Sequence, residues 1–387
     1  MKKTKKVGIF GYILIAFLVL ALIISVGAID LSGLIDKAED TGKVGDPYEP
    51  GLISADGTFT KWSVLEDVGY VVVADDTLTS VSGSVSGHLL VPYGITAIGK
   101  NAARDCGGLT AITIPSTLSE IEICAFMNCS SLKSINMPER FDTSLLINGS
   151  AFLNCASLES LELVEGISLI GNSSFKNCTA LKYVFMSDTV CEIGKSSFYG
   201  CEQLALVRLS ANVETIPGSA FYGCRSLSFV DIPENSNLTD IQDNAFSDTT
   251  NLKTIVIPEG VEHIGNSSFK NSTVETVILP ETVISIGTSA FYGCKNLREI
   301  SFPSSFESIG GSAFYGCESL YDIELPASIK YIGPSAFKLS GVSLFNYLGT
   351  AEEFNNVELL EYWYGDGQSY IEVHCSDRII GFGVLED

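Results

Sequence analysis

Large apolar residues recur along most of the chain at a nearly constant interval. Ten Ala-Phe or Ser-Phe pairs fall in one regular series, with spacings of 26, 23, 23, 23, 25, 23, 22, 23 and 23 residues between successive phenylalanines. These are Phe126, Phe152, Phe175, Phe198, Phe221, Phe246, Phe269, Phe291, Phe314 and Phe337. Ala103 lies 23 residues before the first of them and marks a degenerate first copy. Eleven copies of one period predict a stacked-repeat protein, although the length alone would suggest two or three domains.

Within each repeat the apolar residues predict two extended segments. The first reads L-x-x-I-x-I-P, as at 109–115, and the alternation at its end points side chains in turn toward a core and toward solvent. Its proline ends the strand, because proline has no N–H for a continuing ladder. The second reads V-x-x-I-G, as at 283–287, and its glycine permits a corner. One repeat cannot form a core alone, so neighbouring repeats must share apolar layers.

These features predict a β-solenoid of about eleven 23-residue repeats. At ~4.8 Å per rung, the repeats would form a parallel sheet roughly 50 Å long. We expect the solenoid at residues 78–341, a spacer and N-terminal cap at 30–77, and a C-terminal cap at 342–387. The stretch 30–50 is typical of a spacer, because it contains glycine and proline and few large apolar residues.

The repeat resembles a known family. From one cysteine to the next it reads C-x-x-L-x-x-I-x-I-P-x-x-V-x-x-I-G-x-x-A-F-x-x-C, a string that is almost intact at Cys294–Cys317. This string resembles the BspA-like leucine-rich repeat, over about residues 78–341. The end of the chain also looks like that family's C-terminal segment, through Tyr347, Gly349, Thr350, Phe354, Val373, His374, Cys375 and Asp377. Arg378 stands where a glycine is more usual, and Phe354 where a tryptophan is usual. The resemblance implies a surface-exposed, non-enzymatic binding protein of the adhesin type.

The first 29 residues combine a basic end with a long apolar run. Four lysines within the first six residues precede an uncharged stretch at 7–29. As a helix, that stretch would cover roughly 34 Å, enough to cross a ~30 Å hydrocarbon core. An uncleaved membrane anchor is the favoured interpretation, and a cleavable signal peptide ending near Val26 and Ala28 is the alternative. In both cases the lysines stay inside and the rest of the chain is exported, to be anchored at the cell surface or secreted.

Composition and charge narrow the class of function. Lys plus Arg total 23 and Asp plus Glu total 46, and the resulting net charge of −23 argues against a nucleic-acid partner. Hydrophobic residues make up 46% of the chain, which is enough to bury a core and excludes a disordered acidic tail. Only three histidines occur, and no H-E-x-x-H, G-x-S-x-G, P-loop or G-x-G-x-x-G motif is present. We therefore predict no enzyme, no catalytic residue and no cofactor.

Cysteine is abundant, and most cysteines occupy one repeat position. Eight of the eleven lie three positions after the phenylalanine or its equivalent: Cys106, Cys129, Cys155, Cys178, Cys201, Cys224, Cys294 and Cys317. Disulfides between neighbouring rungs are one interpretation, because the protein is predicted to be exported and the rung spacing would permit them. The same rung is Thr249, Ser272 and Ser340 in other repeats, which favours buried free thiols that bond to the corner backbone. No C-x-x-C pair exists, so we predict no metal site. The other three, with packing roles only, are Cys124, Cys191 and Cys375.

Two outward columns of the first strand carry the candidate binding residues. They lie two and four positions after the strand's first apolar residue, and in the central repeats they are apolar: Tyr183, Phe185, Leu206, Phe229, Val256 and Ile278. Arg208, Lys182 and Lys253 edge these six residues, and acidic residues lie toward either end. A contiguous apolar patch with aromatic and Arg anchors is typical of a protein interface. The alternative is partial burial of these side chains against one another, or cover by a neighbouring segment.

Seven N-x-S/T sequons occur, several at equivalent repeat positions: Asn128, Asn148, Asn172, Asn177, Asn237, Asn266 and Asn271. Turn chemistry explains asparagine at a repeated corner without a sugar. N-glycosylation is the other interpretation, and it requires a cell with the machinery.

We predict an extracellular, adhesin-like binding protein for a protein or glycan partner, which touches the membrane only through its N-terminal apolar segment. The alternative is a structural cell-surface protein that self-associates laterally in an envelope layer.

Overall fold

The computed structural model describes residues 49–365 and 370–383. The anchor or signal peptide predicted at residues 1–29, and most of the spacer, lie outside these described residues and stay predictions. In the part that is described, no helix has the length and apolarity that crossing a membrane requires.

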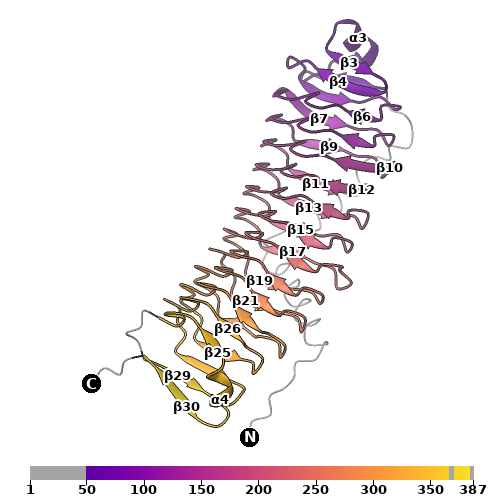
Figure 1. Cartoon of the computed structure of the whole chain (residues 1–387). Coiled ribbons are helices and arrows are strands. Elements are labelled where there is room, and N and C mark those ends of the chain that lie inside the picture. Colours follow the sequence, from indigo (N-terminus) through magenta and orange to yellow (C-terminus); the bar gives the residue numbers. More distant parts are fainter. Residues whose placement is uncertain (1–48, 366–369, 384–387) are drawn as a thin grey trace, which may run out of the picture. The chain divides into compact units, whose positions relative to one another are not determined.

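The described residues form the predicted β-solenoid, whose successive turns stack along one axis (Figure 1). Each turn contributes one strand to a first parallel ladder: β5 (Gly87–Leu90), β7 (Leu109–Thr113), β9 (Ser134–Asn136), β11 (Ser160–Leu163), β13 (Tyr183–Met186), β15 (Leu206–Arg208), β17 (Phe229–Asp231), β19 (Thr254–Val256), β21 (Thr276–Ile278), β23 (Glu299–Ile300), β25 (Asp322–Leu325) and β27 (Leu344–Tyr347). The ladder is interrupted between β9 and β11, between β17 and β19, and between β23 and β25. The first two interruptions coincide with the repeats of 26 and 25 residues, because the extra residues displace the strand.

The second segment of the repeat also pairs, so the solenoid has two parallel ladders where the sequence predicted one. Its strands are β6 (Ala97–Ile98), β8 (Glu120–Ile121), β10 (Arg140–Ile147), β12 (Glu165–Ile170), β14 (Glu192–Ile193), β16 (Thr215–Ile216), β18 (Asp240–Ile241), β20 (His263–Ile264), β22 (Ser285–Ile286), β24 (Ser308–Ile309), β26 (Tyr331–Ile332) and β28 (Glu358–Leu359). Most have two residues, of which the isoleucine is buried and the preceding residue faces outward. The predicted corner glycine follows directly, as in Gly287, whose Cβ would meet the Asn266 backbone at 2.8 Å.

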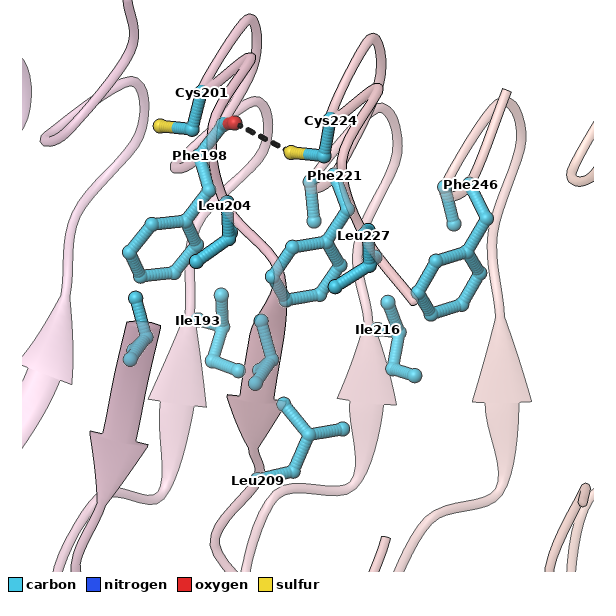
Figure 2. Close-up of a cluster of buried hydrophobic side chains, with 14 of the residues drawn as sticks. Ile193, Phe198, Cys201, Leu204, Leu209, Ile216, Phe221, Cys224, Leu227 and Phe246 are labelled. Atoms are coloured by element: carbon cyan, nitrogen blue, oxygen red, sulfur yellow. Dashed lines mark hydrogen bonds between the residues drawn. The ribbon is translucent and has the colours of Figure 1, made fainter. Parts of the chain in front are cut away.

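The repeated phenylalanines form a continuous stack through the core. All ten rings are essentially inaccessible to solvent. Consecutive ring centroids lie 5.1 to 5.6 Å apart, and the ring planes differ by at most 11°. Figure 2 shows three of them, Phe198, Phe221 and Phe246, with Leu204 and Leu227 packed beside the stack. The stack links the ten turns that carry it, each to the next, as a solenoid without a single central core requires.

Each turn has two corner residues with a positive φ, and at most of these positions the residue is not glycine. The residue two positions before the phenylalanine has a positive φ in every repeat and is usually serine, as in Ser196 at 56°. The residue two positions after it also has a positive φ and is usually Asn, Asp or Gly, the types that adopt this conformation most readily. Asn177 there donates from Nδ2 to Asn154 Oδ1 at 3.0 Å, and Asn154 donates likewise to Asn128 Oδ1 at 2.8 Å. Turn chemistry therefore accounts for the sequons at this position.

The cysteine ladder consists of buried free thiols, as predicted. All eleven cysteines are free, and the eight ladder cysteines are fully buried. In most rungs the thiol donates to the phenylalanine carbonyl of the preceding turn, as Cys224 Sγ does to Phe198 O at 3.3 Å (Figure 2). Burial raises the pKa of the Cys201 thiol to about 12, because an apolar interior disfavours the thiolate. Thr249 instead forms a hydrogen bond within its own turn, in which Oγ1 donates to Phe246 O at 2.8 Å.

Three buried hydroxyls next to the phenylalanine stack lack a hydrogen-bond partner within the described residues, those of Ser174, Ser197 and Ser268. Alanine occupies the same position, next to the phenylalanine, in most other repeats. Ser197→Ala should therefore raise the free energy of unfolding by about 1 kcal/mol, since it removes an unsatisfied polar group without leaving a cavity. Urea denaturation measures the change. Ser210→Ala is the matched control and should destabilise, because buried Ser210 Oγ accepts from Asn212 N at 3.0 Å; stabilisation by both changes would contradict this account.

The two ends of the stack are covered by non-repeating elements. The N-terminal elements are β1 (Gly51–Ile53), β2 (Phe59–Lys61), α3 (Trp62–Asp67), β3 (Val71–Ala74) and β4 (Thr77–Val81), and the C-terminal ones are α4 (Ala351–Phe354), β29 (Ile371–His374) and β30 (Ile379–Phe382). Trp62 is buried at the first end. Trp363 contacts Phe337 edge-on at 6.4 Å between centroids and ends the phenylalanine stack. In α4, Thr350 and Glu353 form a reciprocal capping box.

Candidate binding surface

Parallel pairing aligns the central outward residues in two columns. In the first column Tyr183 of β13 pairs with Leu206 of β15, which pairs with Phe229 of β17. In the second column Phe185 pairs with Arg208. Each of these residues therefore has its neighbour one rung away, at the ~4.8 Å spacing of paired strands.

The remaining two apolar residues belong to the next segment of the ladder. Val256 of β19 pairs with Ile278 of β21 in the second column. The interruption between β17 and β19 separates this pair from Phe229. We call the six apolar residues at 183, 185, 206, 229, 256 and 278 the apolar island; it consists of a four-residue part and a two-residue part.

Most of the apolar island is half-buried. Tyr183, Phe185, Leu206, Phe229 and Ile278 are all of intermediate exposure, while 48% of Val256 is exposed. The rings of Tyr183 and Phe185 contact each other, with centroids 5.4 Å apart. The side chains thus shield one another in part and still present accessible apolar surface.

The basic residues that edge the apolar island are each paired with an acid. Arg208 Nε lies 3.7 Å from Asp231 Oδ2, in the same column. Lys182 Nζ lies 3.5 Å from Glu159 Oε2, and Lys253 is paired with Glu275 at 3.1 Å. All three pairs are solvent-exposed, so each contributes at most about 1 kcal/mol to stability. Their main effect is to neutralise the edge of the apolar island.

The histidines lie on separate turns with different partners. His88 Nε2 is 2.7 Å from Thr113 Oγ1, and burial lowers the pKa of His88. His263 Nδ1 is 2.6 Å from Ser285 Oγ, and His374 Nε2 is 3.2 Å from Glu372 Oε2. Within the described ranges, no group of three or more His, Cys, Asp or Glu side chains could hold a metal ion.

One surface hollow lies away from the outward columns. It encloses about 450 Å³ beside β16 and β18, and polar residues line it, among them Lys195, Asp240 and Gln242. Gln242 stands at the corner position usually held by glycine, and its Oε1 accepts from Gly218 N at 3.2 Å. The hollow therefore lies at an irregular corner and includes none of the candidate binding residues.

Stacked tyrosines form a feature that the sequence analysis did not identify. Tyr199 and Tyr222 have centroids 4.8 Å apart, and Tyr292 and Tyr315 have centroids 4.7 Å apart. Lys176 Nζ lies 4.4 Å from the centroid of Tyr199. All four tyrosines directly follow the repeated phenylalanine, and tyrosine recurring at that position was the available signal. Stacking and the two lysines, Lys176 over Tyr199 and Lys270 over Tyr292, stabilise the corner.

Comparison with known proteins identifies the repeat. A family model described as BspA type leucine rich repeat region (6 copies) matches residues 96–227, 146–275 and 262–357, which together exceed half of the chain. No curated protein matches the chain significantly.

Several solved structures are also similar. A leucine-rich repeat protein of T. pallidum is 25% identical over 47% of this chain and 86% of its own, with a TM-score of 0.41. One from Bacteroides ovatus is 23% identical over 81% of this chain and 97% of its own, with a TM-score of 0.44. A leucine rich cell surface protein of Faecalibacterium prausnitzii is 21% identical over 74% and 95%, with a TM-score of 0.39. On the match of the family model, the chain belongs to the BspA-type leucine-rich repeat family.

Proposed function

We propose that this protein is a non-enzymatic, extracellular binding protein that contacts a protein partner through the apolar island. The observation that carries the proposal is the register of Tyr183, Leu206 and Phe229 on adjacent rungs, with Phe185 in the neighbouring column. Aromatic residues clustered at the centre of a surface, surrounded by paired charges, are characteristic of interface hot spots. The name of the F. prausnitzii protein, a cell surface protein, supports an exported location.

Lateral assembly in an envelope layer has less support. The chain carries a net charge of −23, so identical sides of neighbouring solenoids would repel each other. Size-exclusion chromatography with light scattering separates the two functions, because a layer protein should form large assemblies and a binding protein can be monomeric.

The proposed function predicts that Phe185→Ser combined with Phe229→Ser abolishes capture of the partner in a pull-down from the protein's natural surroundings. Both rings are half-buried on the outward face, so the far-UV circular dichroism spectrum should not change. The matched control is Tyr93→Ser combined with Ile123→Ser, which removes two exposed apolar side chains (68% and 51% exposed) outside the columns. Retained capture by the first variant, or equal loss in both, would overturn the proposal.

A further inference from the structure

The outward columns continue from the apolar island into a row of acidic residues. Glu299 of β23 pairs with Thr276 of β21, the strand that carries Ile278. One repeat further on, beyond the interruption between β23 and β25, Asp322 and Glu324 occupy the equivalent repeat positions. All three carboxylates are exposed. We call these three residues the acidic row.

The acidic row differs from the acids around the apolar island in having no ion-pair partner among the described residues. Glu159, Asp231 and Glu275 each pair with a base, at 3.1 to 3.7 Å. Within the ranges 49–365 and 370–383, Glu299, Asp322 and Glu324 are in no such pair, and neither is Arg298, the base that precedes the row. Even with Arg298 included, the row keeps a net negative charge that a partner could neutralise.

A partner that binds this surface therefore needs two kinds of side chain, in a fixed order along the stack. The apolar island favours aromatic or aliphatic side chains, and the acidic row favours Lys or Arg and repels anionic glycans and nucleic acids. The two-residue part of the apolar island lies next to the acidic row, whereas Phe229, at the end of the four-residue part, is three rungs from Glu299 and four from Asp322. At ~4.8 Å per rung these separations are about 14 and 19 Å, which an extended peptide spans in about four to six residues.

We infer that the surface receives an extended segment of a partner protein in which the apolar side chains that contact the four-residue part of the apolar island lie about four to six residues from a Lys- or Arg-rich stretch. This inference rests on the proposed function, because it needs the apolar island to be the contact, and it adds the chemistry and spacing of the partner. Affinity comes mainly from the apolar contact, and the acidic row adds orientation and a faster, salt-sensitive association.

Selection from a peptide library tests the spacing directly. The full chain is immobilised, and a phage-displayed library of random peptides of about twelve residues, long enough to cover both surfaces, is panned against it. The expected result is enrichment of peptides with apolar residues and Lys or Arg at the stated separation, and loss of their binding to Phe229→Ser. Enrichment of apolar peptides without basic residues, still lost in Phe229→Ser, would overturn the inference and leave the proposed function intact. No enrichment, or binding unaffected by Phe229→Ser, would overturn both.

Neutralising the acidic row gives the second arm. In a variant with Glu299→Gln, Asp322→Asn and Glu324→Gln, a selected peptide should bind about tenfold more weakly at low salt. Raising NaCl from about 50 mM to about 300 mM should weaken peptide binding to the wild type more than to this variant. Salt screens the attraction between the acidic row and the basic residues of the peptide, which only the wild type has. The control carries Glu259→Gln, Glu262→Gln and Glu281→Gln, three exposed acids outside the columns, with the same change in net charge. Equal loss of affinity in both variants would show a general charge effect and overturn the inference.

Discussion

Raising the pH from about 9 to about 10 should destabilise the folded protein by roughly 10 kcal/mol and unfold it. In the unfolded chain a cysteine thiol ionises near pH 8.5, whereas burial raises the pKa of Cys155, Cys201 and Cys294 to about 12 in the folded stack. Between these values the folded state keeps protons that the unfolded state has released, so stability falls as pH rises. Each thiol contributes about 1.4 kcal/mol per pH unit in this window, and eight thiols share the same buried environment.

The measurement is the urea midpoint, followed by circular dichroism under reducing conditions between about pH 8 and about pH 10. Replacing Cys201 and Cys224 with threonine, the residue present at rung 249, should reduce the slope of stability against pH by about 1.4 kcal/mol per pH unit for each thiol removed. Ser210→Ala is the control, because it changes a buried residue that carries no titratable group, and it should leave the slope unchanged. Comparing variants also removes the contribution of Tyr222, whose pKa is raised to about 12, chiefly by its hydrogen bond to Asp248. Equal slopes in all variants would contradict the explanation.

The repeat period was enough to predict the solenoid, because stacking imposes one environment on each position. A rung that accepts Cys224, Thr249 and Ser272 can only be small, buried and weakly polar, and the structure has free thiols bonded to the backbone there. The second ladder was not predicted as a sheet, since its strands are mostly two residues long and show no alternation. The strands of the second ladder pair because stacking of the turns through the first ladder also brings the second segments side by side. Ile264 then lies next to Ile286.

The columns of the candidate surface were predictable, but the exposure of their residues was not. Parallel pairing without an insertion keeps residue 23 positions on in the same column, so the alignment of Tyr183 and Leu206 follows from counting. The repeat that ends at Phe246 is two residues longer than the period, and the ladder is interrupted there. Counting residues therefore does not predict how Val256 is placed relative to Phe229. Exposure depends on contacts between neighbouring side chains, such as Tyr183 with Phe185, which arise only in the folded state.

The largest effect of a single core substitution is expected at Phe221, in the sixth of the eleven repeats. Phe221→Ala removes a fully buried ring that stacks on Phe198 at 5.5 Å and on Phe246 at 5.4 Å. We expect a loss of about 3 to 5 kcal/mol, from lost burial and from the cavity that remains. Arg225→Ala, on the same turn, removes only an exposed ion pair with Glu202 and should cost at most about 1 kcal/mol.

Because each turn contacts only its neighbours, Phe221→Ala should also uncouple the two halves of the solenoid. The chain has two tryptophans, Trp62 near the first turn and Trp363 at the last, so each can report on one end. With Trp62→Phe, the fluorescence of the remaining Trp363 follows unfolding of the C-terminal end alone. With Trp363→Phe, the fluorescence of Trp62 follows unfolding of the N-terminal end alone. The two urea transitions should coincide in the otherwise wild-type chain and separate once Phe221→Ala is added. Coincident transitions after that change, or a cost below about 1 kcal/mol, would mean that the phenylalanine stack does not carry the cooperativity of the repeats.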